Sequence, residues 1–150
     1  MKFFLLFLAL LGIDLGIKWY LNTENIDSIT LIPYFLDYFL TKNTGIALSL
    51  FSSSSSFTQI FLLILIFIAL IFLTYTFLKT QDITQKIGLL LVLSGGFGNF
   101  IERLFYGSVT DYLHLRIGTT SLFVFNFADF LITLGAVLII VIWIREGKNV

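Results

Sequence analysis

The sequence predicts an all-α membrane protein with four transmembrane helices and a small extracytoplasmic β element. Hydrophobic residues make up 58% of the 150 residues and charged residues only 12%, whereas soluble domains carry about 25% charged residues. Four apolar stretches approach the roughly 20 residues that a helix needs to cross a bilayer. Because this length suits one domain, we expect a single integral membrane domain over residues 1–150.

The first predicted span covers about residues 3–21. Asp14 and Lys18 interrupt its apolar pattern four positions apart, so both lie on one face of a helix. The simplest interpretation is a salt bridge or a snorkelling anchor near the outer surface. Lys2 and the apolar run after it also resemble a signal peptide, but no small-residue cleavage motif follows, so we expect the segment to be retained.

The other three predicted spans cover about residues 57–78, 87–105 and 125–144. The second span has no charged residue, and its length favours a helix in lipid. The third span is rich in glycine, which permits close helix approach in a membrane. The fourth contains Asp129 and ends near Trp143, an aromatic residue of the kind that anchors helices at the membrane interface.

The basic residues predict that both termini lie in the cytoplasm. Four spans place the two termini on one side of the membrane, and basic residues outside the spans are more frequent on the cytoplasmic side. The residues on the side of the termini are Lys2, Lys79, Lys86, Arg145 and Lys148, and those on the other side are Lys42 and Arg116. The segments 22–56 and 106–124 therefore face outward in this prediction.

The two outward segments are expected to carry the β element. Residues 29–51 contain several β-favouring stretches, and the serine run at 52–56 is typical of a flexible connector. From 109 to 117, apolar residues alternate with polar ones, which predicts a half-buried strand. Asp111 falls on the apolar face of that strand, and His114 on the opposite face, where we expect a surface residue.

Two carboxylates, Asp111 and Asp129, stand in apolar outward-side surroundings without a local basic partner. Two neighbouring carboxylates do not both ionise easily, so they can share a proton and supply one acid and one base. Such a pair can activate water and protonate a leaving amine, which is peptide hydrolysis. The structural alternative is that each carboxylate caps a helix or pairs with Arg103 or Arg116.

Further polar residues share helical faces near these acids. Asn99 and Arg103 are four positions apart, and Asn126 and Asp129 are three apart. Arg103 is expected either to snorkel or to bond loop carbonyls or a carboxylate and so support the site.

Composition excludes several other chemistries. The chain has no cysteine, which excludes disulfides, thiolate metal sites and a cysteine nucleophile. A single histidine argues against a histidine-based metal centre. The net charge of zero implies no nucleic-acid partner.

Five short stretches together resemble the bacterial lipoprotein signal peptidases, the type II signal peptidase family of aspartic proteases. They are DLGIK at 14–18, NTGIA at 43–47, GGFGNFIER at 95–103, GSVTD at 107–111 and FNFAD at 125–129. The resemblance implies an inner-membrane aspartic endopeptidase that removes the signal peptide from diacylglyceryl-modified prolipoproteins, cutting before the lipidated Cys. It implies no metal and no organic cofactor, an active site near the extracytoplasmic face, and lipid-modified prolipoprotein and membrane lipids as partners of a monomer.

By position, the resemblance implies that Asp111 and Asp129 form the catalytic pair. The supporting or substrate-binding positions that it implies are Asn43, Gly45, Asn99, Arg103, Asn126, Asp14 and Lys18.

The chain departs from the family pattern at four positions, none of which removes a proposed catalytic group. Glu102 replaces the usual Asp, Leu48 a Phe, Val124 a Pro, and Phe130 a Ser. Phe130 adds bulk beside Asp129, so we expect these departures to affect substrate preference or rate.

Two other functions stay open. One is a small four-span transporter or non-enzymatic membrane protein whose acids relay protons, and the other is an inactive paralogue. A proton relay would spread its acids across the depth of the bilayer, whereas here the acids gather toward one side.

Overall fold

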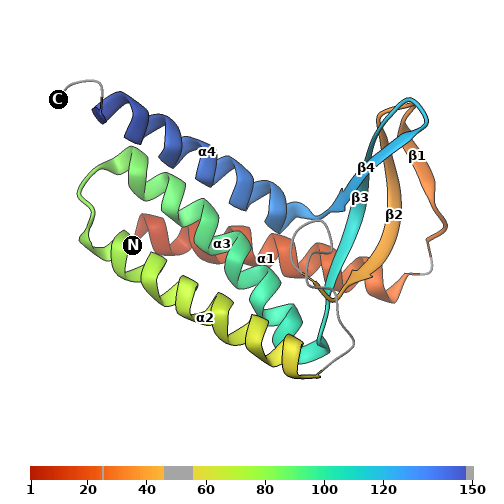
Figure 1. Ribbon diagram of the computed structural model, residues 1–150, viewed down its shortest axis with the longest axis horizontal. Coiled ribbons are helices and arrows are strands. Elements are labelled where there is room, and N and C mark those ends of the chain that lie inside the picture. Colours follow the sequence, from red (N-terminus) through yellow and green to blue (C-terminus); the bar gives the residue numbers. More distant parts are fainter. Residues whose placement is uncertain (25, 46–55, 148–150) are drawn as a thin grey trace.

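The computed structural model describes residues 1–24, 26–45 and 56–147. Four long helices run side by side, and a small sheet stands at one end of them (Figure 1). The helices are α1 (Lys2–Thr23), α2 (Ser56–Lys79), α3 (Ile83–Tyr106) and α4 (Phe127–Gly147). All four are long and apolar enough to cross a membrane, so the predicted fold class is confirmed.

The sheet has four antiparallel strands that lie in chain order. The strands are β1 (Ile29–Ile32), β2 (Leu36–Asn43), β3 (Val109–Ile117) and β4 (Thr120–Phe125). β2 pairs with β3, which joins two segments that are separated in sequence by α2 and α3. The predicted β-favouring region therefore contains β1 and β2, while its residues 46–51, with Leu48, and most of the serine run lie outside the described residues.

The starts of α3 and α4 differ from the prediction, and α1 and α4 end two and three residues later than predicted. α3 begins at Ile83, before the predicted residue 87, because the Asp82 carboxylate accepts a hydrogen bond from the Gln85 main-chain N–H at 2.6 Å and caps the helix. The fourth span was predicted from residue 125, but Phe125 is the last residue of β4 and the helix begins two residues later. The start of α4 is fixed by polar contacts at the site described below.

The predicted alternation of β3 is wrong in its first half. Its first four residues, Val109 to Tyr112, are all buried, and its second half is more exposed. Both faces are covered there because Thr110 packs toward α1 and α3 while Asp111 faces β2 and the start of α4. His114 lies at the surface of the sheet as predicted and is half-buried there, with its Nε2 2.7 Å from Ser121 Oγ.

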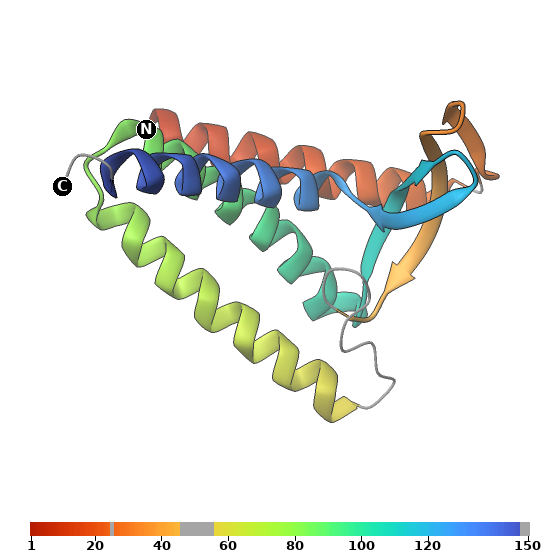
Figure 2. The ribbon, with the colours of Figure 1, turned by 45° about the horizontal axis from the view of Figure 1, so that its top comes forward.

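α3 is the central helix of the bundle. Half of its apolar span is buried inside the protein, against 11–17% for the other three helices. Glycines allow α3 and α4 to approach closely, because a Cβ at Gly95 would overlap the Ala128 carbonyl and one at Gly135 would overlap the Gly88 carbonyl. α2 packs on α3 and diverges from α1 and α4 toward the sheet end (Figure 2).

Candidate active site

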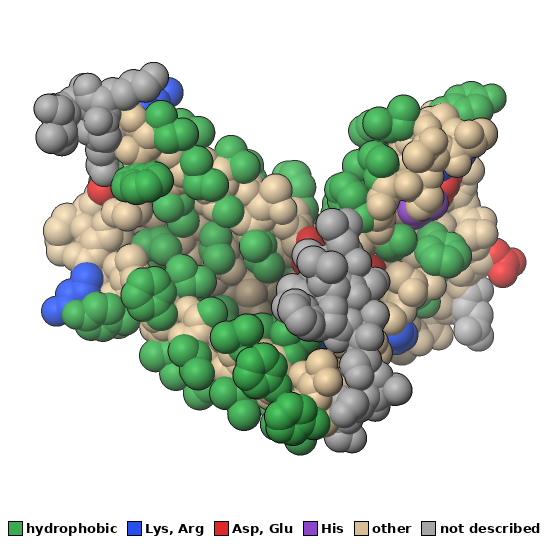
Figure 3. Space-filling view, viewed as in Figure 1, with side chains coloured by type: hydrophobic (Ala, Val, Ile, Leu, Met, Phe, Trp, Pro, Cys, Tyr) green, Lys and Arg blue, Asp and Glu red, His purple; other side chains and the backbone are tan. Residues whose placement is uncertain are grey.

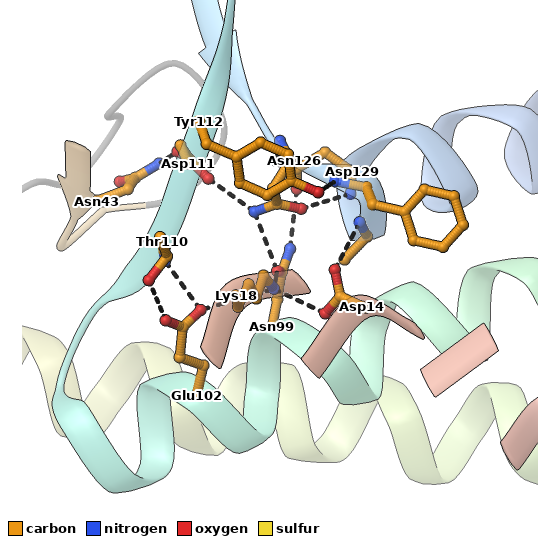
Figure 4. A network of polar contacts seen from close by, with 12 residues as sticks. Asp14, Lys18, Asn43, Asn99, Glu102, Thr110, Asp111, Tyr112, Asn126 and Asp129 are labelled. Atoms are coloured by element: carbon orange, nitrogen blue, oxygen red, sulfur yellow. Dashed lines mark hydrogen bonds and ion pairs between the residues drawn. The ribbon is translucent and has the colours of Figure 1, made fainter. Parts of the chain in front are cut away.

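All nine predicted site residues lie in one connected polar network between the helix bundle and the sheet (Figure 4). They come from α1, β2 and the residues just after it, α3, β3, and the start of α4. The sequence separation between the parts reaches 114 residues, in the bond from the Ala128 N–H to Asp14. The fold therefore assembles this site from five of the eight described elements, which are far apart in the sequence.

Asp111 is held by one amide on each carboxylate oxygen. Its Oδ2 accepts a hydrogen bond from Asn43 Nδ2 at 2.9 Å, and its Oδ1 accepts one from Asn126 Nδ2 at 2.7 Å. Burial is the main cause that raises the pKa of Asp111, and together with the negative charge of Asp129, and against the two amide bonds, it brings this pKa to about 6. Asp111 therefore changes charge close to neutral pH.

Asp129 lies in the first turn of α4, where it caps its own helix. Its Oδ2 accepts a hydrogen bond from the Asn126 main-chain N–H at 3.1 Å, and its own N–H donates to Asn126 Oδ1 at 2.9 Å. This reciprocal arrangement is a capping box. The remaining oxygen, Oδ1, accepts from Asn99 Nδ2 at 2.8 Å. The helix-capping alternative is thus correct for Asp129, and the cap also brings Asp129 into contact with a residue that binds Asp111.

The other arginine considered in the structural alternative is engaged elsewhere. Arg116 Nε lies 2.6 Å from Asp37 Oδ2 on the outer part of the sheet. Arg116 is therefore the ion-pair partner of Asp37 rather than of a site carboxylate.

Two more side chains secure the first amides of α4. The Phe127 N–H donates to the Tyr112 hydroxyl oxygen at 3.1 Å, and the Ala128 N–H donates to Asp14 Oδ1 at 3.0 Å. Burial raises the pKa of Tyr112 to about 12, so the phenol stays neutral at physiological pH. A carboxylate at a helix N-terminus is also favoured by the helix dipole. Asp14 and Tyr112 consequently fix the turn that presents Asp129.

Lys18 links Asp14 to the centre of the network. Its ammonium lies 2.8 Å from Asp14 Oδ2 and donates to Asn99 Oδ1 at 2.7 Å. The predicted salt bridge is confirmed, but both partners are almost fully buried, so the snorkelling alternative is wrong. Because Lys18 occupies the oxygen of the Asn99 amide, the amide NH2 must face Asp129. Gly98 leaves the space that the Asp14 carboxylate fills, since a Cβ there would overlap Oδ2.

Arg103 supports Asp111 through two intermediates. Its Nη2 donates to the Gly45 carbonyl, which confirms the predicted bond to a loop carbonyl. The Gly45 N–H donates to Asn43 Oδ1 at 2.9 Å, and this leaves the Asn43 NH2 free to donate to Asp111. Arg103 therefore orients the loop that orients one of the two amides on Asp111.

Several members of the network were not predicted. Glu102 was noted only as a departure from the family pattern, although an acid in an apolar span, three residues after Asn99, is itself a signal of a polar site. Thr110 and Tyr112 are polar positions in the alternating pattern of the predicted half-buried strand, and such positions carry no signal of a site. Asn22 and Lys42 also bind this network, through the Thr110 hydroxyl.

A pocket of about 280 Å³ opens beside Asp111 on the sheet. Its lining combines polar residues of β2 with apolar residues of β4: Phe39, Thr41, Lys42, Asn43, Asp111, Leu122, Phe123 and Val124. Figure 3 shows a hollow between the helices and the sheet with apolar walls and acidic side chains at its base. In the part of the chain that the structure describes, no group of three or more His, Cys, Asp or Glu side chains could hold a metal ion.

Besides Glu102, the structure places two more of the residues that depart from the family pattern. Val124 lines the pocket beside Asp111. Phe130 is 51% exposed and stacks on Phe127 with ring centroids 6.5 Å apart, so its ring lies at the surface of α4.

The fold and this site define a multi-pass membrane protein with two hydrogen-bonded carboxylates at one end of its helix bundle, of which Asp111 is buried and Asp129 half-buried. A family model described as Signal peptidase (SPase) II matches residues 6–145. The chain therefore belongs to the signal peptidase II family and is a protease, and the transporter alternative is not favoured.

Individual relatives agree with this assignment. The chain is 38% identical to a lipoprotein signal peptidase of Bartonella quintana, an alignment that covers 99% of the chain and 92% of the relative. It is 36% identical to one of Wigglesworthia glossinidia brevipalpis, covering 82% and 80%. A solved bacterial membrane enzyme superposes with a TM-score of 0.86 at 30% identity, over 99% of this chain and 90% of that one.

Proposed function

We propose that this chain removes the signal peptide from diacylglyceryl-modified prolipoproteins by aspartic catalysis, with Asp111 and Asp129 as the catalytic pair. The observation that carries the proposal is that Asn126 binds both acids. Its side-chain NH2 donates to Asp111 Oδ1 at 2.7 Å and its main-chain N–H donates to Asp129 Oδ2 at 3.1 Å. One residue thus holds the buried carboxylate of Asp111 and the half-buried carboxylate of Asp129, which come from different elements.

The proposed reaction uses one proton shared by the pair. The ionised carboxylate takes a proton from a water molecule as the water oxygen attacks the scissile carbonyl. The protonated carboxyl polarises the carbonyl oxygen and later gives its proton to the leaving amine of the lipidated cysteine. A pKa of about 6 for Asp111 supports this exchange, since a group that titrates near the working pH can act in either form.

The position of the site suits a substrate that cannot leave the bilayer. A signal peptide is an apolar helix and its lipid is anchored in the membrane, so the enzyme must meet both in the membrane plane. Hydrolysis needs water, and the two carboxylates lie where the helix bundle joins the sheet. We propose that this end faces outward in the inner membrane, with both termini cytoplasmic and one integral domain that acts as a monomer among membrane lipids.

Reporter fusions test the orientation. A periplasmic phosphatase joined to the C-terminus should be inactive, and the same reporter inserted at Gly118, in the β3–β4 turn, should be active. An active C-terminal phosphatase would overturn the proposed topology.

The catalytic pair is tested with purified protein in detergent and a lipid-modified precursor. Asp111→Asn and Asp129→Asn should each lower kcat by at least about 1,000-fold, and the double variant should lose little more, because the two groups act as a unit. Asp37→Asn, on the same sheet but paired with Arg116, is the matched control and should keep wild-type kcat. Turnover near the wild-type rate in either single variant, or no turnover by well-folded wild-type protein, would contradict the proposal.

A further inference from the structure

Glu102 is a buried carboxylate in the network that the proposed reaction does not use. It lies on α3 and is 4% exposed. Its Oε2 accepts a hydrogen bond from the Thr110 main-chain N–H at 2.8 Å, and its Oε1 accepts one from the Thr110 hydroxyl. Thr110 directly precedes Asp111 in β3, so Glu102 holds the strand at the residue before the proposed catalytic group (Figure 4).

The Thr110 hydroxyl has no other way to use its proton. Asn22 Nδ2 donates to Thr110 Oγ1 at 2.9 Å and Lys42 Nζ donates to it at 2.7 Å. A hydroxyl has two acceptor positions and one proton, so both acceptor positions are occupied and the proton goes to Glu102. Thr110 is fully buried, and this one oxygen therefore ties β3 to α1, β2 and α3.

Glu102 also reaches the side of the network that holds Asp129. Its Oε2 lies 3.6 Å from Lys18 Nζ, and Lys18 donates to the Asn99 oxygen, which turns the Asn99 NH2 toward Asp129. On the other side, Lys42 Nζ lies 3.8 Å from Glu102 Oε1. Glu102 is thus the negative charge between two ammonium groups, one on each side of the network.

We infer, on the basis of the proposed function, that Glu102 is a positioning residue for both catalytic carboxylates. It acts on Asp111 through Thr110, and on Asp129 through Lys18 and Asn99. Glu102 does not line the pocket beside Asp111, and it is buried beneath the pair, so it makes no contact with substrate. The role differs from a general structural one because it predicts a loss of turnover without a loss of substrate binding.

The first test is Glu102→Gln, which keeps the size of the side chain and removes its charge. The glutamine would accept a hydrogen bond through its one oxygen, while its NH2 would face the second donor of Thr110. One of the two hydrogen bonds between this position and Thr110 would therefore be lost. We expect kcat for a lipid-modified precursor to fall by about 10- to 100-fold, the range for a small misplacement of reacting groups, while KM stays within about twofold of wild type. The second test uses two variants of Thr110. Thr110→Val removes the hydroxyl and should lower kcat by a similar factor. Thr110→Ser keeps the hydroxyl and should have a kcat close to that of wild type.

Ser94→Ala is the matched control for a buried polar loss on the same helix. Ser94 lies about two turns before Glu102 on α3 and is fully buried. Its hydroxyl donates a hydrogen bond to the Leu90 carbonyl. This variant should keep wild-type kcat and KM.

The outcomes separate this inference from the proposed function. A folded Glu102→Gln protein with wild-type kcat, or with a change confined to KM, overturns the positioning role. If thermal unfolding shows that Glu102→Gln does not fold, equal kcat in the Val and Ser variants of Thr110 overturns it instead. If Asp111→Asn keeps its turnover, the proposed function itself fails, whatever the Glu102 variants do.

Discussion

Asn126 and Asp129 each accept a hydrogen bond from the other's main-chain N–H, at 2.9 Å and 3.1 Å, across the first turn of α4. The residue proposed to carry out chemistry therefore also caps the helix on which it stands. A change at either position affects the start of α4 and the arrangement of the two acids together.

Asn126→Ala should lower both stability and turnover. It removes the cap, which contributes about 1 kcal/mol, and leaves Asp111 Oδ1 without its amide donor, so we expect a total loss of about 2–3 kcal/mol in the free energy of unfolding. Chemical unfolding in detergent and precursor cleavage measure the two effects. Asp82→Ala is the control. It removes the N-terminal cap of α3, which lies at the end of α3 away from the site, and it should lower stability by about 1 kcal/mol and leave turnover unchanged.

Gly98→Ala should disturb the site through Asp14. A Cβ at Gly98 would overlap Asp14 Oδ2, the oxygen that pairs with Lys18, and the Ala128 N–H holds the other oxygen, Oδ1. Overpacking of this kind costs about 1–3 kcal/mol, and we expect the melting temperature and kcat to fall together. Gly12→Ala, in the same helix as Asp14, meets nothing within 4 Å and should leave both unchanged; equal behaviour of the two variants would contradict the close fit.

The pH dependence of stability should reveal the raised pKa of Asp111. The ordinary pKa is 3.8 and the folded protein raises it to about 6, so between these values the folded protein binds a proton that the unfolded chain has released. Stability from this group is therefore present below pH 4 and is lost as pH rises through 6. A shift of about 2 units corresponds to about 3 kcal/mol.

The difference between wild type and Asp111→Asn isolates this effect. From pH 4 to pH 7.5, the free energy of unfolding of the variant should rise relative to wild type by about 3 kcal/mol. Asp37→Asn should show the opposite sign at lower pH, because the hydrogen bond from Arg116 lowers the pKa of Asp37 below its ordinary 3.8. Wild type therefore gains relative stability as pH rises through that lower range and should show little change from pH 4 to pH 7.5. A pH-independent difference for Asp111→Asn would contradict the raised pKa.

Arg103→Ala should weaken the loop that orients Asn43. The Gly45 carbonyl would lose its guanidinium donor, and a buried group left unpaired costs about 1–3 kcal/mol. Precursor cleavage and thermal unfolding should both decline. Arg145, exposed at the far end of α4, supplies the control, and Arg103→Ala with melting and turnover like those of Arg145→Ala would show that Arg103 has no supporting role.

The sequence predicted those parts of the molecule that depend on local pattern. Span length identified the four helices, and i, i+4 spacing identified the pair of Asp14 and Lys18. The burial of Tyr112 could not be predicted, because it results from the packing of β3 against the bundle and not from the alternation within β3. The role of Glu102 depends on a bond to Thr110, eight residues later and past the end of α3, which no helical periodicity reveals.

α2 differs from the other three membrane helices because it supplies no residue to the polar network described above. The contacts between α2 and α3 include the stacked rings of Phe67 and Phe100 and the fit of Leu70 against Gly96. Lipid tails are as apolar as these side chains, so they can replace such contacts at little loss of free energy. The polar contacts of the network join α1, β2, α3, β3 and α4, so a displacement of α2 would leave these contacts in place.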